Sequence, residues 1–219
     1  MPETRSFVSL AYSVVICTYG RTEMCRQTVA DLLPLIDDRG EIVVVAQAVG
    51  QPSRDLYCAP GVPLEKVRVF FLDQPNLIHA RNLGIRESRG EITIFVDDDI
   101  KPGTGFVKGH VAEYHNPAVG GVAGRILSEL ESPREKLNPL ALDPQAGWWH
   151  TNFDHRERVP LMHARGCNMS FRRALLVEIG GFDPCCRAFR DDSDVSFRVR
   201  ALGYKLVFGP DAELLHLEA

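Results

Sequence analysis

The chain has 219 residues, of which 45% are hydrophobic and 25% charged, and its formal net charge is −4. These values are typical of a globular protein with a sizeable core, organised as one α/β domain or one large domain with a short appendage. A negative net charge without a long basic run argues against nucleic acid as a partner. No stretch reaches the ~18 apolar residues that a transmembrane segment needs, and the amino terminus lacks the pattern of a signal peptide.

The six cysteines do not form a metal-binding pattern of their own. None belongs to a CxxC pair, and the adjacent thiols of Cys185 and Cys186 are interpreted as incidental. Reduced thiols fit a cytoplasmic location, which we therefore expect. Because the net charge is negative, an anionic ligand must be held by local groups or by a metal ion.

Buried strands alternate with amphipathic helices through the first hundred residues. Apolar, Val- and Ile-rich runs predict strands inside a parallel sheet, at residues 13–18, 41–47, 67–72 and 92–96. Helices are predicted between them, from Thr22 as N-cap to Ile36 and over residues 76–88. This order with short connections indicates βαβ units and an α/β fold.

After residue 102 the pattern is looser. Helices are predicted at 105–115, at 173–179 and from Asp192 or Ser193 to Leu202, and strands at 119–127, 161–172, 205–208 and 212–217. Segment 128–160 has no clear periodicity, and long irregular segments in compact domains often serve a function. Its Trp148 and Trp149 suit stacking on a sugar ring, with packing as the alternative.

Three consecutive carboxylates, Asp97, Asp98 and Asp99, follow the strand at 92–96. They fall at the carboxyl end of that strand, where open α/β sheets bind their ligands. Adjacent negative charges repel, so the run needs solvent or a divalent cation as compensation. Alternation along an extended chain directs Asp97 and Asp99 one way and Asp98 another. A solvated acidic turn is the alternative, whereas an EF-hand loop is excluded by Lys101 and Pro102.

Five segments together resemble family-two glycosyltransferases with the GT-A fold. They are VVICTYGR, EIVVVAQ, HARNLGIRESRGEITIFVDDDIKP, RGCNMSFRRALLVEIGGFDP and RDDSDVSFRVRALGYKL, which occur in the family's order. The resemblance implies a single GT-A domain over residues 1–219, a Rossmann-like three-layer sandwich with a mainly parallel central sheet. Residues 1–102 would form the half that binds the nucleotide sugar, and residues 103–219 the half that binds the acceptor.

The resemblance implies transfer of a sugar, with inversion, from a nucleotide-diphosphate donor to an acceptor hydroxyl. Mn²⁺ or Mg²⁺ would assist, because a cation held by one or two carboxylates neutralises charge on the diphosphate. The acceptor would be a saccharide, a lipid-linked compound or a small molecule. The resemblance is also compatible with peripheral contact with a membrane.

The matching motifs also imply roles for single residues. Asp99 corresponds to the last acid of the DxD motif and is the expected metal ligand, together with Asp97 and with His216, for which packing is the alternative. Asp192 corresponds to the catalytic base and Asp191 precedes it, although both would also be favoured at a helix start without catalysis. The expected nucleotide-sugar contacts are Thr18, Tyr19, Arg21, Gln47, Arg81, Asp97 and Asp98, and the expected acceptor contacts are Trp148, Trp149, Gly166 and Asn168.

The second strand departs from the family's pattern. Many members carry an acid there that contacts the uracil edge, whereas this chain has Ala46 and Gln47. A side-chain amide offers both a donor and an acceptor, so Gln47 could still pair with a base edge. This departure counts against a uridine-diphosphate sugar as the donor. Donors that carry guanosine or thymidine remain compatible with the sequence.

Two other functions are compatible with this fold. A catalytically silent module that binds a nucleotide sugar or carbohydrate would be expected to lack the metal acids or the Asp192 position, and neither is lost. A sugar nucleotidyltransferase usually carries a Gly-rich, Arg-containing loop after the first strand, which CTYGRTEM matches poorly. That turn also lacks the GxGxxG and GxxxxGKS/T patterns of common nucleotide-binding loops.

Overall fold

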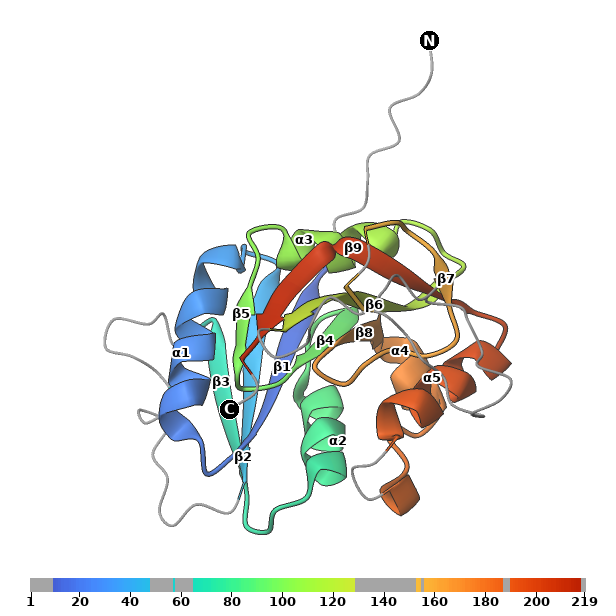
Figure 1. The fold of residues 1–219 in the computed structure, drawn as a ribbon. Helices are drawn as coiled ribbons and strands as arrows, with labels where there is room; N and C mark the ends of the chain where they lie inside the picture. Colours follow the sequence, from blue (N-terminus) through green and yellow to red (C-terminus); the bar gives the residue numbers. More distant parts are fainter. Residues whose placement is uncertain are drawn as a thin grey trace.

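One mixed sheet organises the part of the chain that the computed structural model describes, which is residues 10–47, 57, 65–128, 153–154, 156–186 and 190–217 (Figure 1). The strands are β1 (Tyr12–Tyr19), β2 (Gly40–Gln47), β3 (Val67–Leu72), β4 (Ile92–Val96), β5 (Ile100–Pro102), β6 (Val119–Ser128), β7 (Pro160–Leu161), β8 (Asn168–Arg172) and β9 (Lys205–His216). The helices are α1 (Thr22–Leu32), α2 (Leu77–Glu87), α3 (Phe106–Glu113), α4 (Arg173–Glu178) and α5 (Asp191–Ala201), with short 3-10 helices at Leu33–Leu35 and Pro184–Cys186.

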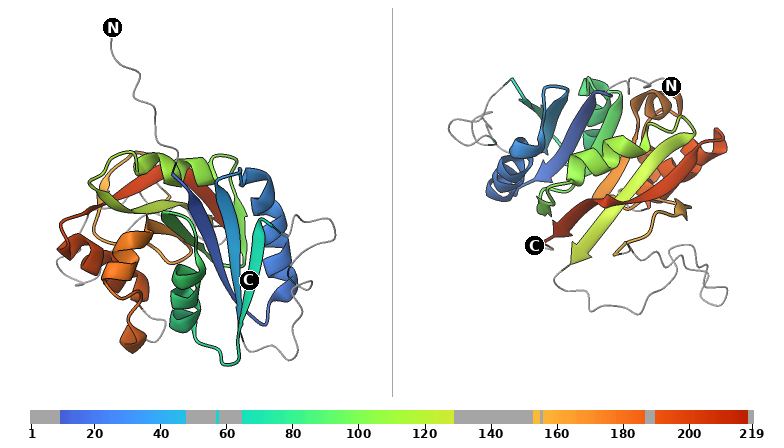
Figure 2. Two further views of the ribbon diagram at one scale, coloured as in Figure 1. Left: turned by 180° about the vertical axis from the view of Figure 1, so that it is seen from behind. Right: turned by 90° about the horizontal axis from the view of Figure 1, so that it is seen from above.

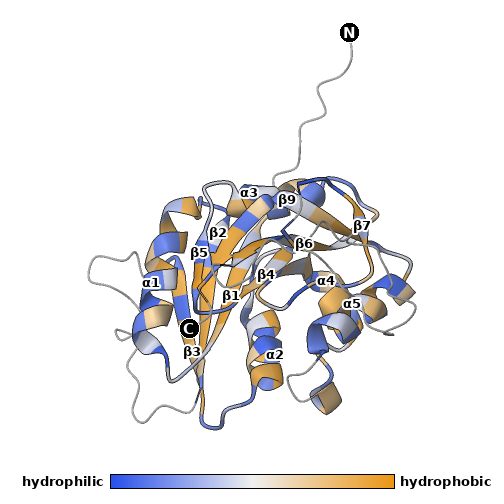
Figure 3. Cartoon of the chain, viewed as in Figure 1, coloured by the Kyte–Doolittle hydropathy of each residue, from blue (hydrophilic) through white to orange (hydrophobic). Residues whose placement is uncertain are grey.

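The strands β3, β2, β1 and β4 form the parallel half of the sheet. Ile16 of β1 lies opposite Val44 of β2 and Val96 of β4, and every side chain of β4 is buried. Figure 3 shows apolar residues concentrated on these strands, while the helices alternate apolar and polar positions. The predicted βαβ units and α/β class are confirmed, because strands that are apolar on both faces must be covered on both sides.

The other half of the sheet contains antiparallel pairs. Strand β8 runs antiparallel between β4 and β6, and β9 pairs in parallel with β6 and antiparallel with β5 and β7. The prediction of two strands at 205–208 and 212–217 is wrong, because pairing with β6 continues through a register shift between Gly124 and Ile126. Instead of one strand over 161–172, the chain forms the separate strands β7 and β8.

Two predicted helix starts are one residue late or more. Helix α1 has Arg21 at its N-cap, and α5 has Arg190, so the predicted caps Thr22, Asp192 and Ser193 lie inside the helices. Arg190 adopts a left-handed conformation with φ of 59°, and helix α5 begins at the next residue, Asp191, before the predicted start. The predicted end of α1 at Ile36 is also wrong. The helix ends at Leu32 and continues as a 3-10 turn over Pro34, which has no amide hydrogen to extend the α-helical ladder.

The helices cover both faces of the sheet. Helices α2, α4 and α5 pack together on one side, and α1 and α3 lie on the other (Figure 2). None of the helices in the described ranges is long and apolar enough to cross a membrane. Because β1, β2 and β4 are parallel, their carboxyl ends share one edge of the sheet, and this edge brings the predicted site residues together.

Candidate active site

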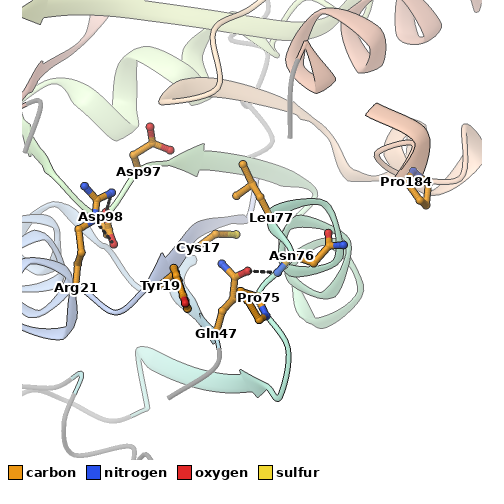
Figure 4. A pocket seen from close by; sticks show the side chains of 10 residues that line it. All are labelled: Cys17, Tyr19, Arg21, Gln47, Pro75, Asn76, Leu77, Asp97, Asp98 and Pro184. Atoms are coloured by element: carbon orange, nitrogen blue, oxygen red, sulfur yellow. Dashed lines mark hydrogen bonds and ion pairs between the residues drawn. The ribbon is translucent and has the colours of Figure 1, made fainter. Parts of the chain in front are cut away.

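A cavity of ≈ 640 Å³ opens at the carboxyl edge of the parallel strands (Figure 4). Its size lies within the range of clefts that bind small molecules and cofactors. Five of the predicted nucleotide-sugar contacts line it: Tyr19, Arg21, Gln47, Asp97 and Asp98. The sequence did not single out the other lining residues, which are Cys17, Pro75, Asn76, Leu77 and Pro184.

Tyr19 ends β1 at the rim of this cavity. Its side chain is 58% exposed, unusually open for a large aromatic residue at the end of a buried strand. Gly20 follows with a φ of 70°, and no atom lies within 4 Å of the position that a Cβ would take there, so glycine is favoured by backbone conformation and not by lack of room. This turn leads directly to Arg21, whose guanidinium faces the acid run.

Gln47 joins three elements at the base of the cavity. Its Oε1 accepts a hydrogen bond from the Asn76 backbone N–H at 2.7 Å (Figure 4). Its Nε2 donates to the Thr18 carbonyl at 3.4 Å. Asn76 in turn caps α2, accepting the His79 N–H at 3.0 Å. The amide is therefore held in a defined orientation at the cavity wall, and its contact with a nucleotide base stays a prediction.

Within the first acid run, Asp98 points into the protein. Its Oδ2 accepts hydrogen bonds from Thr18 Oγ1 at 2.5 Å and from Arg21 Nε at 3.3 Å, and its Oδ1 forms an ion pair with Arg21. Burial raises the pKa of Asp98 despite the opposing effects of Thr18 and Arg21. Thr18 therefore holds the Asp98 side chain in place through its hydrogen bond. Asp98 also forms part of the cavity wall.

Asp97 and Asp99 both turn toward His216, as the alternation predicted. The distance from His216 Nε2 is 3.6 Å to Asp97 Oδ2 and 3.2 Å to Asp99 Oδ1. The histidine reaches this position because Ile100 of β5 pairs with His216 of β9. Hydrogen bonds to Asp97 and then Asp99 raise the pKa of His216 to about 10. Burial of Asp99 opposes its ionisation, but His216 and Arg21 outweigh this effect and lower its pKa.

These residues fit a divalent cation. Asp99 Oδ1 is buried and faces His216 Nε2 at 3.2 Å. Such an oxygen is costly unless a cation or a proton compensates it. Two carboxylates and one imidazole could hold Mn²⁺ or Mg²⁺ and leave positions for phosphate oxygens and water.

Two thiols that sequence analysis did not assign to the site flank Asp97. Ile16, Val96 and Asn168 are aligned across β1, β4 and β8, so the neighbouring residues Cys17, Asp97 and Cys167 also lie side by side. Burial, reinforced for both by the charge of Asp97, raises the pKa of each thiol to about 12. The sequence offered a positional signal for Cys17 only, which lies near the carboxyl end of the predicted strand at 13–18, whereas Cys167 fell in the middle of the predicted strand at 161–172.

The second acid run meets the same region through Arg81. This side chain is buried and forms an ion pair with Asp191, also buried, and its Nη2 donates to the Gly166 carbonyl at 3.4 Å. The Gly166 N–H donates to Asp192 Oδ2 at 3.0 Å. Burial disfavours the charged form of Arg81, but Asp191 and Asp97 outweigh it and raise the pKa. The predicted residues Arg81, Gly166, Asp191 and Asp192 are therefore brought together.

The predicted acceptor contacts are only partly testable. Trp148 and Trp149 lie outside the described residues. Asn168 is fully buried, and its Nδ2 donates to the carbonyls of Arg125 and Ala212, both at 2.9 Å, while its Oδ1 lies 2.8 Å from His110 Nε2. An acceptor role for Asn168 has no support in this geometry, because its polar groups are engaged inside the protein.

A cavity with acidic side chains at the carboxyl edge of an α/β sheet is typical of enzymes that bind nucleotides or other small ligands there. The model of one such family, Glycosyl transferase family 2, matches residues 13–180, and the chain belongs to this family.

Two curated relatives are similar along much of the chain. A glucosyl-dolichyl phosphate glucuronosyltransferase of Haloferax volcanii is 26% identical over 176 residues, covering 78% of this chain and 55% of the relative. A probable glycosyltransferase of Bacillus subtilis, YdaM, is 24% identical over 209 residues, covering 91% and 49%. The chain thus spans about half the length of these relatives.

Two solved structures confirm the GT-A fold. The mannosyltransferase PcManGT from Pyrobaculum calidifontis, in complex with GDP-Man and Mn²⁺, aligns with a TM-score of 0.70 at 19% identity, over 96% of this chain and 57% of that one. GalNAc-T7 with UDP, GalNAc and Mn²⁺ aligns with a TM-score of 0.69 at 19% identity, over 95% and 44%. At this identity the likeness establishes the fold alone.

Proposed function

We propose that the chain transfers a sugar from a nucleotide-diphosphate donor to an acceptor hydroxyl, with inversion at the anomeric carbon. The observation that supports this most directly is the convergence of a ≈ 640 Å³ cavity, a set of cation ligands and an aspartate-opened helix at one edge of the sheet. Family membership supports it independently, as do the names of two relatives and the nucleotides and Mn²⁺ in the two similar structures.

Asp97, Asp99 and His216 would hold Mn²⁺ or Mg²⁺. When bound, the cation neutralises negative charge that develops on the departing diphosphate. Arg21 contacts both Asp98 and Asp99, and its side chain is 41% exposed, so it can also turn toward a phosphate. In the donor pocket, the exposed ring of Tyr19 offers a face for stacking, and the held amide of Gln47 offers hydrogen bonds to a base.

Asp192 acts as the general base. The acceptor oxygen forms a bond to the anomeric carbon while the bond from that carbon to the diphosphate oxygen breaks, and its electron pair leaves with the diphosphate. Asp192 accepts the proton of the acceptor hydroxyl. Its carboxylate is partly exposed and held by the Gly166 N–H, whereas Asp191 is buried against Arg81 and would have to break that pair to accept a proton. The acceptor is a saccharide, a lipid-linked compound or a small molecule.

A panel of UDP-, GDP- and dTDP-sugars, each with and without Mn²⁺, tests the proposal. We expect one nucleotide family at 100 times its Kd to stabilise the protein by about 2.7 kcal/mol, and only with the cation. Asp99→Ala should remove the cation-dependent part and leave the unfolding transition of the free protein cooperative. Binding without transfer to any hydroxyl would favour the silent binding module, and no cation-dependent binding at all would refute the donor site.

A further inference from the structure

A thiol, that of Cys167, lies beside the carboxylates and the imidazole of the proposed Mn²⁺ or Mg²⁺ site. Among the described residues, one oxygen of Asp97, the Cys167 sulfur and one nitrogen of His216 all lie within 4.8 Å of one another. The three residues come from different elements: the end of β4, the residue before β8 and the end of β9. Strand pairing brings them together, because β8 runs beside β4 and β9 returns beside β5.

We propose that Asp97, Cys167 and His216 form a binding site for a thiophilic divalent cation such as Zn²⁺. Zinc is commonly held by three protein ligands of the sulfur, nitrogen and oxygen types, with a fourth position left to water or substrate. A thiolate favours zinc over magnesium, which prefers oxygen ligands only. This ligand set therefore differs in chemistry from Asp97, Asp99 and His216, although it shares two of their side chains.

The distances are compatible with a tetrahedral ion after a small contraction. Zinc bonds of 2.0–2.3 Å place neighbouring ligand atoms roughly 3.5 Å apart. Asp97 Oδ2 and His216 Nε2 are already 3.6 Å apart, and the sulfur lies within 4.8 Å of both atoms, so it has to approach them by at most about 1.3 Å. Cys167 is 5% exposed, whereas the Asp97 side chain is 37% exposed, so a cation can enter past the carboxylate.

The buried thiol sets the strength of this site. Cys167 is almost fully buried, and a bound cation must displace its thiol proton. Affinity should therefore fall below that of zinc sites built from several preformed thiolates. Exchangeable zinc, rather than a permanent structural ion, is the expected occupant.

Sharing Asp97 and His216 has a consequence for transfer that rests on the proposed function. Zinc on the sulfur side would exclude the hard cation, because both need the same carboxylate and imidazole. Zn²⁺ should then inhibit sugar transfer in competition with Mn²⁺, and Cys167→Ser should relieve much of this inhibition.

Cobalt provides a test that does not depend on activity. The chelator-treated full chain should give a sulfur-to-cobalt charge-transfer band with one equivalent of Co²⁺, and Zn²⁺ should remove the band by displacement. Cys167→Ser and Cys167→Ala should abolish it. They should also weaken Zn²⁺ binding by about 10²-fold or more, since loss of a ligand costs at least as much as loss of its hydrogen-bond support. Affinity for Mg²⁺ should change little in both variants.

Cys17→Ser is the matched control, because Cys17 flanks Asp97 from β1 but is outside the three-residue group. It should keep the band. The proposal is overturned if the wild type gives no band, or if the band persists in both well-folded Cys167 variants and disappears with Cys185 and Cys186 replaced by serine. A wild type that gives the band yet transfers no sugar would keep the zinc site and refute the proposed function.

Discussion

The two acid runs of this protein solve the same electrostatic problem in different ways. In the run at the end of β4, Asp98 and Asp99 are compensated by cationic side chains from distant parts of the chain, Arg21 and His216. In the run that opens α5, Asp191 has one distant cation, Arg81. The Gly166 and Ser193 N–H groups hold Asp192. Arg198, one turn further along the helix, pairs with Asp194, and the positive end of the helix adds to this compensation.

In the first run Asp97 alone stays partly exposed, whereas in the second run Asp192 and Asp194 both do, and Asp194 is paired with Arg198. Around Asp97 the neighbouring groups are further ligands, so the arrangement suits a cation. Around Asp192 they are backbone donors that hold the carboxylate without supplying a full opposite charge, so the arrangement suits proton transfer. Under the proposed function, the partners around each partly exposed carboxylate, and not its exposure alone, would decide its chemistry.

Replacing the reacting acid should give the largest effect. Asp192→Asn keeps the size of the side chain and an oxygen that can accept the Gly166 N–H, so the fold and donor binding should survive. Transfer should fall by about 10²–10⁴-fold, because an amide cannot accept the proton. Turnover with a saturating donor, measured beside donor affinity, checks this.

The control for that experiment is Asp194→Asn in the same helical turn. Asp194 pairs with Arg198 at 2.5 Å, and the two side chains are 30% and 29% exposed. Equal losses of transfer in both variants would contradict the role of Asp192 as base. Loss in Asp191→Asn alone would place the catalytic motif one residue earlier.

Breaking the buried pair should come next in size. Asp191→Asn leaves the charge of Arg81 buried without its partner, and we expect a loss of about 3–5 kcal/mol in the free energy of unfolding. Asp194→Asn, which breaks an exposed pair of the same helix, should cost only about 0.3–0.5 kcal/mol. Urea unfolding of both variants measures the contrast. The double variant Arg81→Met/Asp191→Asn should recover much of the loss, and a further loss would show that the pair itself is not the cause.

A third buried polar cluster, His110 with Ser170 and Asn168, contains no charged group. Unlike the acid runs, it should make the free energy of unfolding depend on pH through one histidine. His110 is fully buried, with Nδ1 2.9 Å from Ser170 Oγ and Nε2 2.8 Å from Asn168 Oδ1, and burial lowers its pKa to about 4. The folded state therefore takes up this proton at lower pH than the unfolded chain. The stabilisation by neutral His110 is complete above pH ~6.5 and is lost as pH falls toward 4.

Between pH 7 and pH 5 the wild type should lose about 2 kcal/mol from this residue. Comparison with His110→Gln isolates the effect, because the contributions of the acid runs are common to both proteins. We expect the gap in unfolding free energy between the two proteins to narrow by that amount at pH 5. A gap that is the same at both pH values would mean that His110 titrates normally in the folded state.

Local patterns were sufficient for the strands that build the donor side. The apolar runs that became β1, β2 and β4 are buried on both faces, and this property is visible in consecutive residues. The acid run after β4 was therefore placed correctly at the carboxyl edge. The alternation of an extended chain also predicted that Asp97 and Asp99 would face one way and Asp98 another.

Tertiary structure alone decided which side chains meet at that edge. Periodicity specifies the face on which a residue lies, but not the strand that lies next to it. The insertion of β8 between β4 and β6 brought Cys167 to Asp97 and enclosed Asn168 among backbone carbonyls. The packing of α2 against the sheet turned Arg81 inward to Asp191, a partner that its sequence position did not indicate. Cys167 and Asp97 are 70 positions apart and Arg81 and Asp191 are 110 apart, and only the burial of apolar surface in one folded sheet brings such distant groups together.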